Sequence, residues 1–119
     1  MNIFSAVKSF MHGSPACTPG ELKELLDRKA DFVLLDVRRA DELAKARIEG
    51  SVHIPLDSLE NRIAELESKR DAEIVVMCHH GMRSSMAANF LRDRGFSHVR
   101  NLTGGIDAYA SVDPAIGRY

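Results

Sequence analysis

Cysteine is scarce in this sequence, with only Cys17 and Cys78 among 119 residues. Two thiols so far apart argue against a disulfide-stapled secreted domain and favour a reducing compartment. The first residues also lack the basic segment and the long apolar run of a secretory signal, and the apolar stretch there is too short to span a bilayer. These absences predict a cytoplasmic protein with no membrane partner.

Neither sign of charge is in excess, because 16 Lys and Arg stand against 17 Asp and Glu, for a net charge of -1. This balance argues against a nucleic-acid partner, which usually requires a basic surface. The length suits one domain that buries about two-thirds of its unfolded surface. We expect a flexible N-terminal arm over residues 1–15, one domain over residues 16–119, and a monomeric protein.

Helical and strand patterns alternate along the chain. Thr18, Pro19 and Glu21 supply the N-cap, first-turn proline and capping-box acid of a first helix. Continuous apolar runs at residues 31–37 and 72–77 indicate strands buried on both faces. Shorter patterns predict helices over 39–50, 56–69 and 104–111, and strands over 51–55 and 98–102. The alternation predicts an α/β fold whose central, mostly parallel sheet is flanked by helices.

The strongest helical pattern begins near Arg83 and ends at Gly95, which suits a left-handed C-terminal cap. Its apolar stripe predicts that the following residues face the core: Met86, Ala87, Phe90 and Leu91.

The segment CHHGMRS, residues 78–84, joins the strand at 72–77 to this helix. Ligands of parallel sheets bind at the carboxyl ends of the strands, where Cys78 lies. A turn this short, with Gly81 at its middle, directs backbone N–H groups inward and forms an anion site at the start of the helix. A thiolate is stabilised in such a site, so the pattern predicts a nucleophilic Cys78 that meets an anionic substrate.

Other roles are possible for residues of these types. A free cysteine at the end of an apolar strand is often a small core residue, but the glycine, the arginine and the helix start disfavour that interpretation for Cys78. Cys17 is expected to be a buried or edge structural thiol. A zinc site is disfavoured because Cys78, His79 and His80 are adjacent and their side chains should diverge. Individually, the two histidines suit loop-surface groups better than acid–base catalysts. The sequence thus predicts neither a metal nor a cofactor.

Three segments together resemble the rhodanese (sulfurtransferase) family. They are LLDVRRADELAKARIEGSVHIPL, IVVMCHHGMRSSMAANFLRDRGF and VRNLTGGIDAY, which follow the order and spacing of that family over about residues 16–119. The resemblance implies a three-layer rhodanese-like fold with a five-stranded parallel sheet. It also implies a catalytic Cys78 that carries a persulfide. The substrate-binding active-site loop would consist of His79, His80, Gly81, Met82, Arg83 and Ser84.

The chain departs from the family pattern at the rim of the site. Residues 46–51 replace the usual Gly-His-Ile-Pro-Gly-Ala turn, Leu43 replaces an aromatic residue, and Tyr109 replaces a tryptophan. These changes affect the framework and the pocket rim rather than the nucleophile. Arg47, in the altered turn, is a candidate to enlarge a positive rim.

The resemblance predicts an enzyme of the thiosulfate sulfurtransferase type. Cys78 would take sulfane sulfur from a small anionic donor such as thiosulfate and pass it to cyanide or a thiol, including one on a sulfur-accepting protein. Arg83 would either face the substrate or hold the loop through an acid, for which Asp36 is a candidate. Asp36 could instead simply end its strand and cap the next helix. Arg38 is a further candidate for support.

Two alternative functions remain open from the sequence. A cysteine-dependent phosphatase also uses a thiolate in an anion cradle before a helix. Its loop has five residues between cysteine and arginine, whereas only four separate Cys78 from Arg83 here. A non-catalytic rhodanese-like module that binds a protein would have no need to retain Cys78, Gly81 and Arg83.

Overall fold

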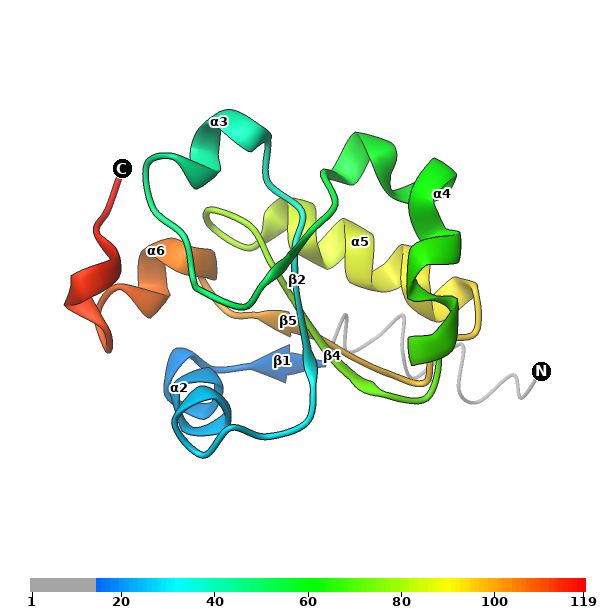
Figure 1. Ribbon diagram of the computed structural model, residues 1–119, viewed down its shortest axis with the longest axis horizontal. Helices are drawn as coiled ribbons and strands as arrows, with labels where there is room; N and C mark the ends of the chain where they lie inside the picture. The colour runs from blue at the N-terminus through cyan, green and yellow to red at the C-terminus, as the bar shows by residue number, and fades with distance from the viewer. Residues whose placement is uncertain (1–14) are drawn as a thin grey trace.

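A computed structural model describes residues 15–119 and places five strands in one sheet with the order β1-β5-β4-β2-β3 (Figure 1). All neighbouring strands are parallel. The strands are β1 (Ala16–Cys17), β2 (Val33–Asp36), β3 (Val52–His53), β4 (Glu73–Met77) and β5 (His98–Leu102). The predicted α/β fold with a five-stranded parallel sheet is confirmed.

Helices cover both faces of this sheet (Figure 1). One face carries α4 (Leu59–Arg62) and α5 (Met82–Asp93), and the other carries α2 (Pro19–Asp27) and α6 (Gly105–Tyr109). A short helix, α3 (Ala40–Leu43), follows β2, and 3₁₀ turns occupy Leu56–Ser58, Ile63–Lys69 and Pro114–Ile116. The arrangement has three layers, because each face of a buried sheet needs an apolar cover.

The two central strands are buried on both faces, as their apolar runs predict. Along β4, Ile74 and Val76 enter one core, whereas Val75 and Met77 enter the other. β2 lies beside it in register, with Leu35 opposite Val76. Because β4 lies at the centre of the order and ends at Met77, the next residue, Cys78, lies at the middle of the carboxyl edge of the sheet.

Helix α5 starts at Met82 and ends with the predicted cap. Gly95 has a φ of +93°, and the N–H of Phe96 donates to the carbonyl of Leu91 at 3.1 Å. This pairing of a left-handed glycine with a 6→1 bond is a Schellman motif. The predicted burial of Met86 is wrong, since that side chain is 58% exposed. The inward stripe is formed instead by Ser84, Ala87, Ala88 and Leu91.

The single helix predicted over residues 56–69 is wrong in part. Only residues 59–62 are α-helical, and the flanking stretches are 3₁₀ turns. The apolar spacing explains the difference, because Leu56 and Leu59, and again Ile63 and Leu66, are three residues apart, which matches the three residues per turn of a 3₁₀ helix. All four side chains still pack against the core that α5 covers.

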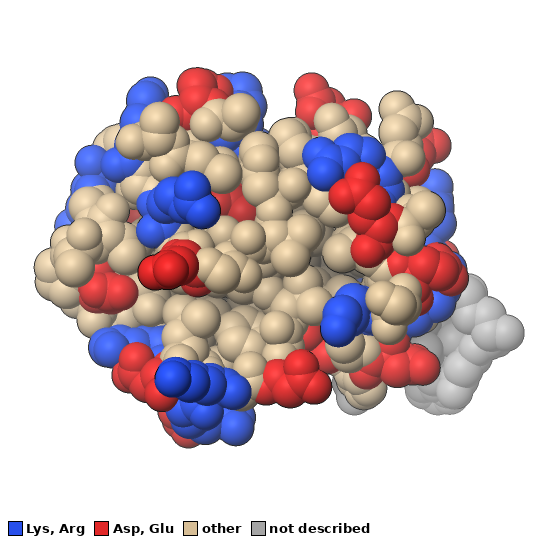
Figure 2. Space-filling model, viewed as in Figure 1, with Lys and Arg blue, Asp and Glu red and all other residues tan. Residues whose placement is uncertain are grey.

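The N-terminal arm predicted for residues 1–15 lies outside the described residues, apart from Pro15. The Pro15 carbonyl accepts a hydrogen bond from the N–H of Asn101 at 2.8 Å and so continues the pairing of β1 with β5. Within residues 15–119, no helix has the length and apolar content required to cross a membrane. On the face shown in Figure 2, acidic and basic side chains alternate around an uncharged centre. An anion on that face would therefore be attracted by single basic side chains rather than by an extended basic patch.

Candidate active site

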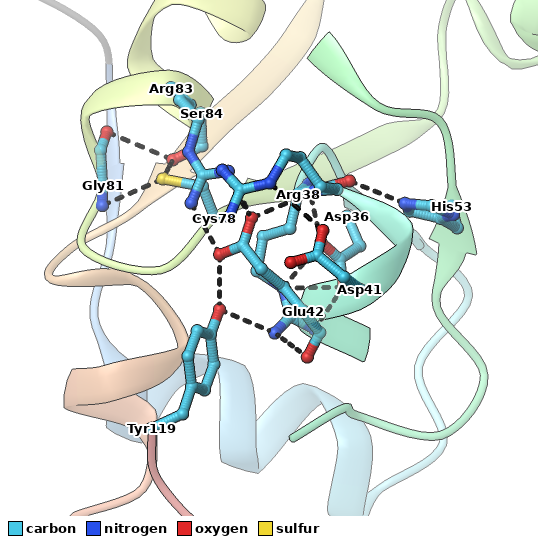
Figure 3. A network of polar contacts seen from close by, with 11 residues as sticks. Asp36, Arg38, Asp41, Glu42, His53, Cys78, Gly81, Arg83, Ser84 and Tyr119 are labelled. Carbon is cyan, nitrogen blue, oxygen red and sulfur yellow. Dashed lines mark hydrogen bonds and ion pairs between the residues drawn. The ribbon is translucent and has the colours of Figure 1, made fainter. Parts of the chain in front are cut away.

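Cys78 lies between the end of β4 and the start of α5, and it is only 1% exposed. Its Sγ accepts a hydrogen bond from the N–H of Gly81 at 3.0 Å, and the Ser84 hydroxyl lies 3.3 Å away (Figure 3). Gly81 has a φ of +112°, a conformation that residues with a side chain rarely adopt. The turn therefore uses its glycine to direct an N–H group at the sulfur.

Helix α6 holds the other side of this turn. The N–H of Ile106 donates to the Cys78 carbonyl at 2.8 Å, and the N–H of Asp107 donates to the His79 carbonyl at 3.1 Å. A Cβ on Gly105 would lie only 2.3 Å from the His79 carbonyl oxygen. Gly105, the first residue of α6, therefore lets two backbones approach closely, and the N–H groups of the first turn of α6 fix the carbonyls of the loop.

Ser84 and Asn101 form a partly buried polar contact beside the sulfur. The Ser84 Oγ lies 2.5 Å from Asn101 Oδ1 and 3.1 Å from the Gly81 carbonyl, and Asn101 Nδ2 donates to that same carbonyl at 3.2 Å. A hydroxyl has one proton, so Ser84 must choose among the Cys78 sulfur, Gly81 and Asn101. Sequence reasoning missed Asn101, which reaches the site from β5.

Arg83 does not pair with Asp36, the partner considered from the sequence. Its guanidinium binds Glu42 at both oxygens, with Nη1 to Oε1 at 2.5 Å and Nη2 to Oε2 at 2.8 Å. Glu42 is on α3, and its pKa is held far below the usual range, chiefly by the hydrogen bonds from Arg83. Glu42 and the Cys78 sulfur in turn raise the pKa of Arg83. Arg83 thus holds the loop to α3 while it remains 30% exposed.

Asp36 pairs with Arg38 instead, because the two side chains are neighbours at the buried carboxyl end of β2. Arg38 donates through Nη2 to Oδ2 at 2.7 Å and through Nε to Oδ1 at 3.0 Å, and both side chains are fully buried. The Arg38 carbonyl lies 2.6 Å from His53 Nε2. This pair fixes the segment between β2 and α3 without touching Cys78.

Tyr119 joins the two ion pairs, and sequence reasoning missed it (Figure 3). Its hydroxyl accepts from Arg38 Nη1 at 2.9 Å and donates to Glu42 Oε2 at 2.8 Å. Its ring stacks on His79 with centroids 3.9 Å apart and planes 9° apart. No local pattern in the sequence indicates this role, because the contacts span about 40 and 77 residues.

His79 and His80 do not diverge as their adjacency suggested. Their rings stack at 3.9 Å with planes 23° apart, and Asp107 brings a third donor atom within 4.8 Å of theirs. Imidazole lone pairs lie in the ring plane, so nearly parallel rings do not aim two nitrogens at one point. His79 Nε2 also lies 3.0 Å from the Tyr119 main-chain oxygen. The stack and the contact with Tyr119 order the loop.

Two of the candidate residues lie away from the sulfur. Met82 points into solvent with 79% of its surface exposed. Arg47 lines a groove of about 1140 Å³ between the α3–β3 connection and the C-terminal segment, and the residues lining it do not include Cys78 or its loop. Cys17 lies on β1 in the opposite core, where burial raises the pKa of its thiol. That environment disfavours the thiolate form of Cys17.

Comparison with known proteins shows the family of the chain. A sequence model of the family described as "Rhodanese-like domain" matches residues 18–112. The chain therefore belongs to the rhodanese-like domain family.

Among its relatives, YrkF of Bacillus subtilis, a sulfur carrier protein by name, is 42% identical over 84 residues, which are 71% of this chain and 44% of YrkF. The chain thus spans less than half of that relative. The thiosulfate sulfurtransferase GlpE of Pseudomonas aeruginosa is 37% identical over 97 residues, which are 82% of this chain and 84% of GlpE. A rhodanese-related crystal structure from Thermoplasma volcanium has a TM-score of 0.74 at 30% identity, covering 83% of this chain and 93% of that one.

Proposed function

We propose that this protein is a sulfurtransferase in which Cys78 carries sulfane sulfur as a persulfide. The observation that carries the proposal is the position of the Cys78 sulfur, which lies 3.0 Å from the Gly81 N–H donor and 3.3 Å from the Ser84 hydroxyl at the start of α5. These neutral donors stabilise a thiolate, and they can equally hold the negative charge of a persulfide.

Two displacements at sulfur complete the reaction. The Cys78 thiolate attacks the outer sulfur of thiosulfate, the S–S bond of the donor breaks, and sulfite leaves with the bonding electron pair. Cyanide or a thiolate then attacks the outer sulfur of Cys78–S–S⁻, forming thiocyanate or a new persulfide and restoring the Cys78 thiolate. Both leaving groups are stable anions, so neither step needs a general acid or base.

The charge state of Glu42 supports sulfur transfer over phosphate transfer. Glu42 is the carboxylate bound to Arg83, beside the loop, and the hydrogen bonds from Arg83 hold its pKa far below the usual range. It therefore stays ionised at neutral pH and cannot protonate a departing alkoxide, as a phosphatase acid must. Sulfur transfer needs no such proton.

The burial of Cys78 restricts the donor and the acceptor. A residue that is 1% exposed is reached by a slim terminal atom, such as the outer sulfur of thiosulfate or of a persulfide, more readily than by a phosphoryl group with its bulky oxygens. GlpE, at 37% identity, is named a thiosulfate sulfurtransferase, and YrkF, at 42%, a sulfur carrier. We infer a small anionic donor and a thiol acceptor, including one on a protein, in the cytoplasm.

A steady-state assay with thiosulfate and cyanide tests this function through the thiocyanate formed. Wild type and Cys17→Ser should turn over, because Cys17 lies in the opposite core. Cys78→Ser should form no thiocyanate above background while keeping the thermal unfolding midpoint of wild type. Turnover by Cys78→Ser, or its loss in a folded Cys17→Ser protein, would contradict the proposal.

A further inference from the structure

Tyr119 lies at the meeting point of the loop and both ion pairs, a position that sulfur transfer itself does not explain. Its hydroxyl accepts a hydrogen bond from Arg38 and donates one to Glu42, at 2.9 and 2.8 Å. Burial raises the pKa of this hydroxyl above its ordinary value. Tyr119 therefore remains protonated at neutral pH and presents a fixed donor to the Glu42 carboxylate.

The negative charge of Glu42 is divided among several donors. Oε1 accepts from Arg83 and from the backbone N–H of Arg39, at 2.5 and 3.1 Å, while Oε2 accepts from Arg83 and from Tyr119. Arg39 Nη1 also lies 3.6 Å from Oε1. Each donor places partial positive charge at the carboxylate, so the negative field of Glu42 at the Arg83 guanidinium is weaker than that of a bare carboxylate. Arg83 lies beside Cys78 in the loop (Figure 3), and the sulfur contributes to raising the pKa of the guanidinium.

We propose that Tyr119 is a positioning residue that sets how strongly the Cys78 site prefers anionic donors. Its hydroxyl shares Glu42 with Arg83 and keeps part of the positive charge of Arg83 available beside the sulfur. Its ring, stacked on His79, holds the loop in position, so that the Arg83 charge stays beside the sulfur. This inference rests on the proposed sulfur transfer and names a residue that helps the site select among sulfur donors.

The hydroxyl of Tyr119 and its stacked ring have separable effects on the site. Without the hydroxyl, Glu42 keeps Arg83 as its dominant donor and neutralises it more fully, so an anion approaching Cys78 meets a weaker positive field. A neutral reagent is indifferent to that field and reports only the shape and order of the loop. Comparing an anionic with a neutral reagent at the same thiol therefore isolates the charge effect.

Alkylation of Cys78 provides the test. Rates are measured at low ionic strength with iodoacetate, an anion, and iodoacetamide, its neutral counterpart, and the modified residue is located by peptide mass. Tyr119→Phe keeps the stacked ring and removes only the hydroxyl. We expect the iodoacetate-to-iodoacetamide rate ratio to fall about two- to five-fold in Tyr119→Phe, the scale of one partly exposed charge contact. Tyr109→Phe, in the core under α2 and α6, is the matched control and should leave the ratio unchanged.

Glu42→Gln shows whether Tyr119 acts through the carboxylate. This variant removes the negative charge, so the ratio should rise, and adding Tyr119→Phe to it should change the ratio no further. An unchanged ratio in Tyr119→Phe, an equal loss of both rates, or the same fall in the Glu42→Gln background would overturn the proposal. Because alkylation uses the free thiol, a failure to form persulfide with a normal Tyr119 response would count against the proposed function alone.

Discussion

Arg83 and Glu42 form a bidentate ion pair that joins the first turn of α5 to α3 across 41 residues of sequence. The carboxylate is nearly buried, with 3% of its side chain exposed, while the guanidinium keeps 30%. Together with the α6 N–H groups that bind the carbonyls of Cys78 and His79, this pair fixes the loop of residues 78–84 at both ends. The shape of the loop thus depends on elements distant from it in sequence.

Removing the carboxylate of this pair should cost stability. Glu42→Gln leaves Arg83 half-buried without its counter-ion, and we expect the free energy of unfolding to fall by about 1–3 kcal/mol, between the values for exposed and fully buried pairs. Urea denaturation measures the change. Glu65→Gln is the control, because Glu65 pairs with Arg62 in solvent. Equal losses in the two variants would show that the Glu42–Arg83 pair is energetically an ordinary surface contact.

The same pair should make stability depend on pH at the acid end. The folded pKa of Glu42 lies well below the unfolded value of about 4.5. Its contribution is therefore complete above pH 4.5 and is lost as the pH falls toward the folded pKa. The difference in unfolding free energy between wild type and Glu42→Gln should be constant from pH 8 to 6 and should shrink progressively below about pH 4.5. A difference that stays constant down to pH 3 would contradict this linkage.

Gly81 should be required for function as well as for stability. An L-residue at its φ of +112° is strained, so Gly81→Ala should destabilise the fold by about 1–2 kcal/mol and displace the N–H that contacts Cys78. Gly50 is a matched control, with a φ of +86° and no atom within 4 Å of an added Cβ. Gly50→Ala should lose similar stability, measured by urea denaturation, but keep sulfur transfer. Retained activity in Gly81→Ala would mean that the turn tolerates another conformation.

Ser84 should support the reactivity of Cys78. Ser84→Ala removes the hydroxyl near the sulfur and leaves Asn101 Oδ1 without that donor, which should cost about 1–3 kcal/mol of unfolding free energy. Alkylation of Cys78 by iodoacetamide at pH 7 should slow, because the sulfur loses the polar group that lies 3.3 Å from it. Ser97→Ala, at an exposed hydroxyl, should change stability by less than about 0.5 kcal/mol and leave alkylation unaffected. An unaltered alkylation rate in Ser84→Ala would assign Ser84 to the fold alone.

The features that could be predicted from the sequence are those set by residues close together in the chain. The capping box at Thr18 and the cap at Gly95 are local, and so is the position of Cys78 between a buried strand and a helix. Met86 was misjudged because an apolar side chain on a helix need not face the core, and here Ser84 takes the inward place. The 3₁₀ turns around α4 were missed because a spacing of three residues also fits one face of an α-helix.

The partners of the loop could not be predicted in this way. Asp36 ends the neighbouring strand, which made it a reasonable partner for Arg83, but Arg38 is only two residues away and occupies both of its oxygens. Glu42 and Tyr119 meet Arg83 and His79 only after the chain has folded. Such contacts are set by the topology, which the alternation of strands and helices does not determine in detail.

The most direct test of the account is the intact mass of the protein after incubation with thiosulfate. The account predicts a gain of one sulfur atom in wild type and in Cys17→Ser, none in Cys78→Ser, and loss of the added mass when cyanide or a thiol is supplied. In parallel, an aryl phosphate should not be hydrolysed above background. Phosphatase turnover that disappears in Cys78→Ser, with no persulfide detected in the wild-type protein, would contradict the assignment of sulfur transfer to this site.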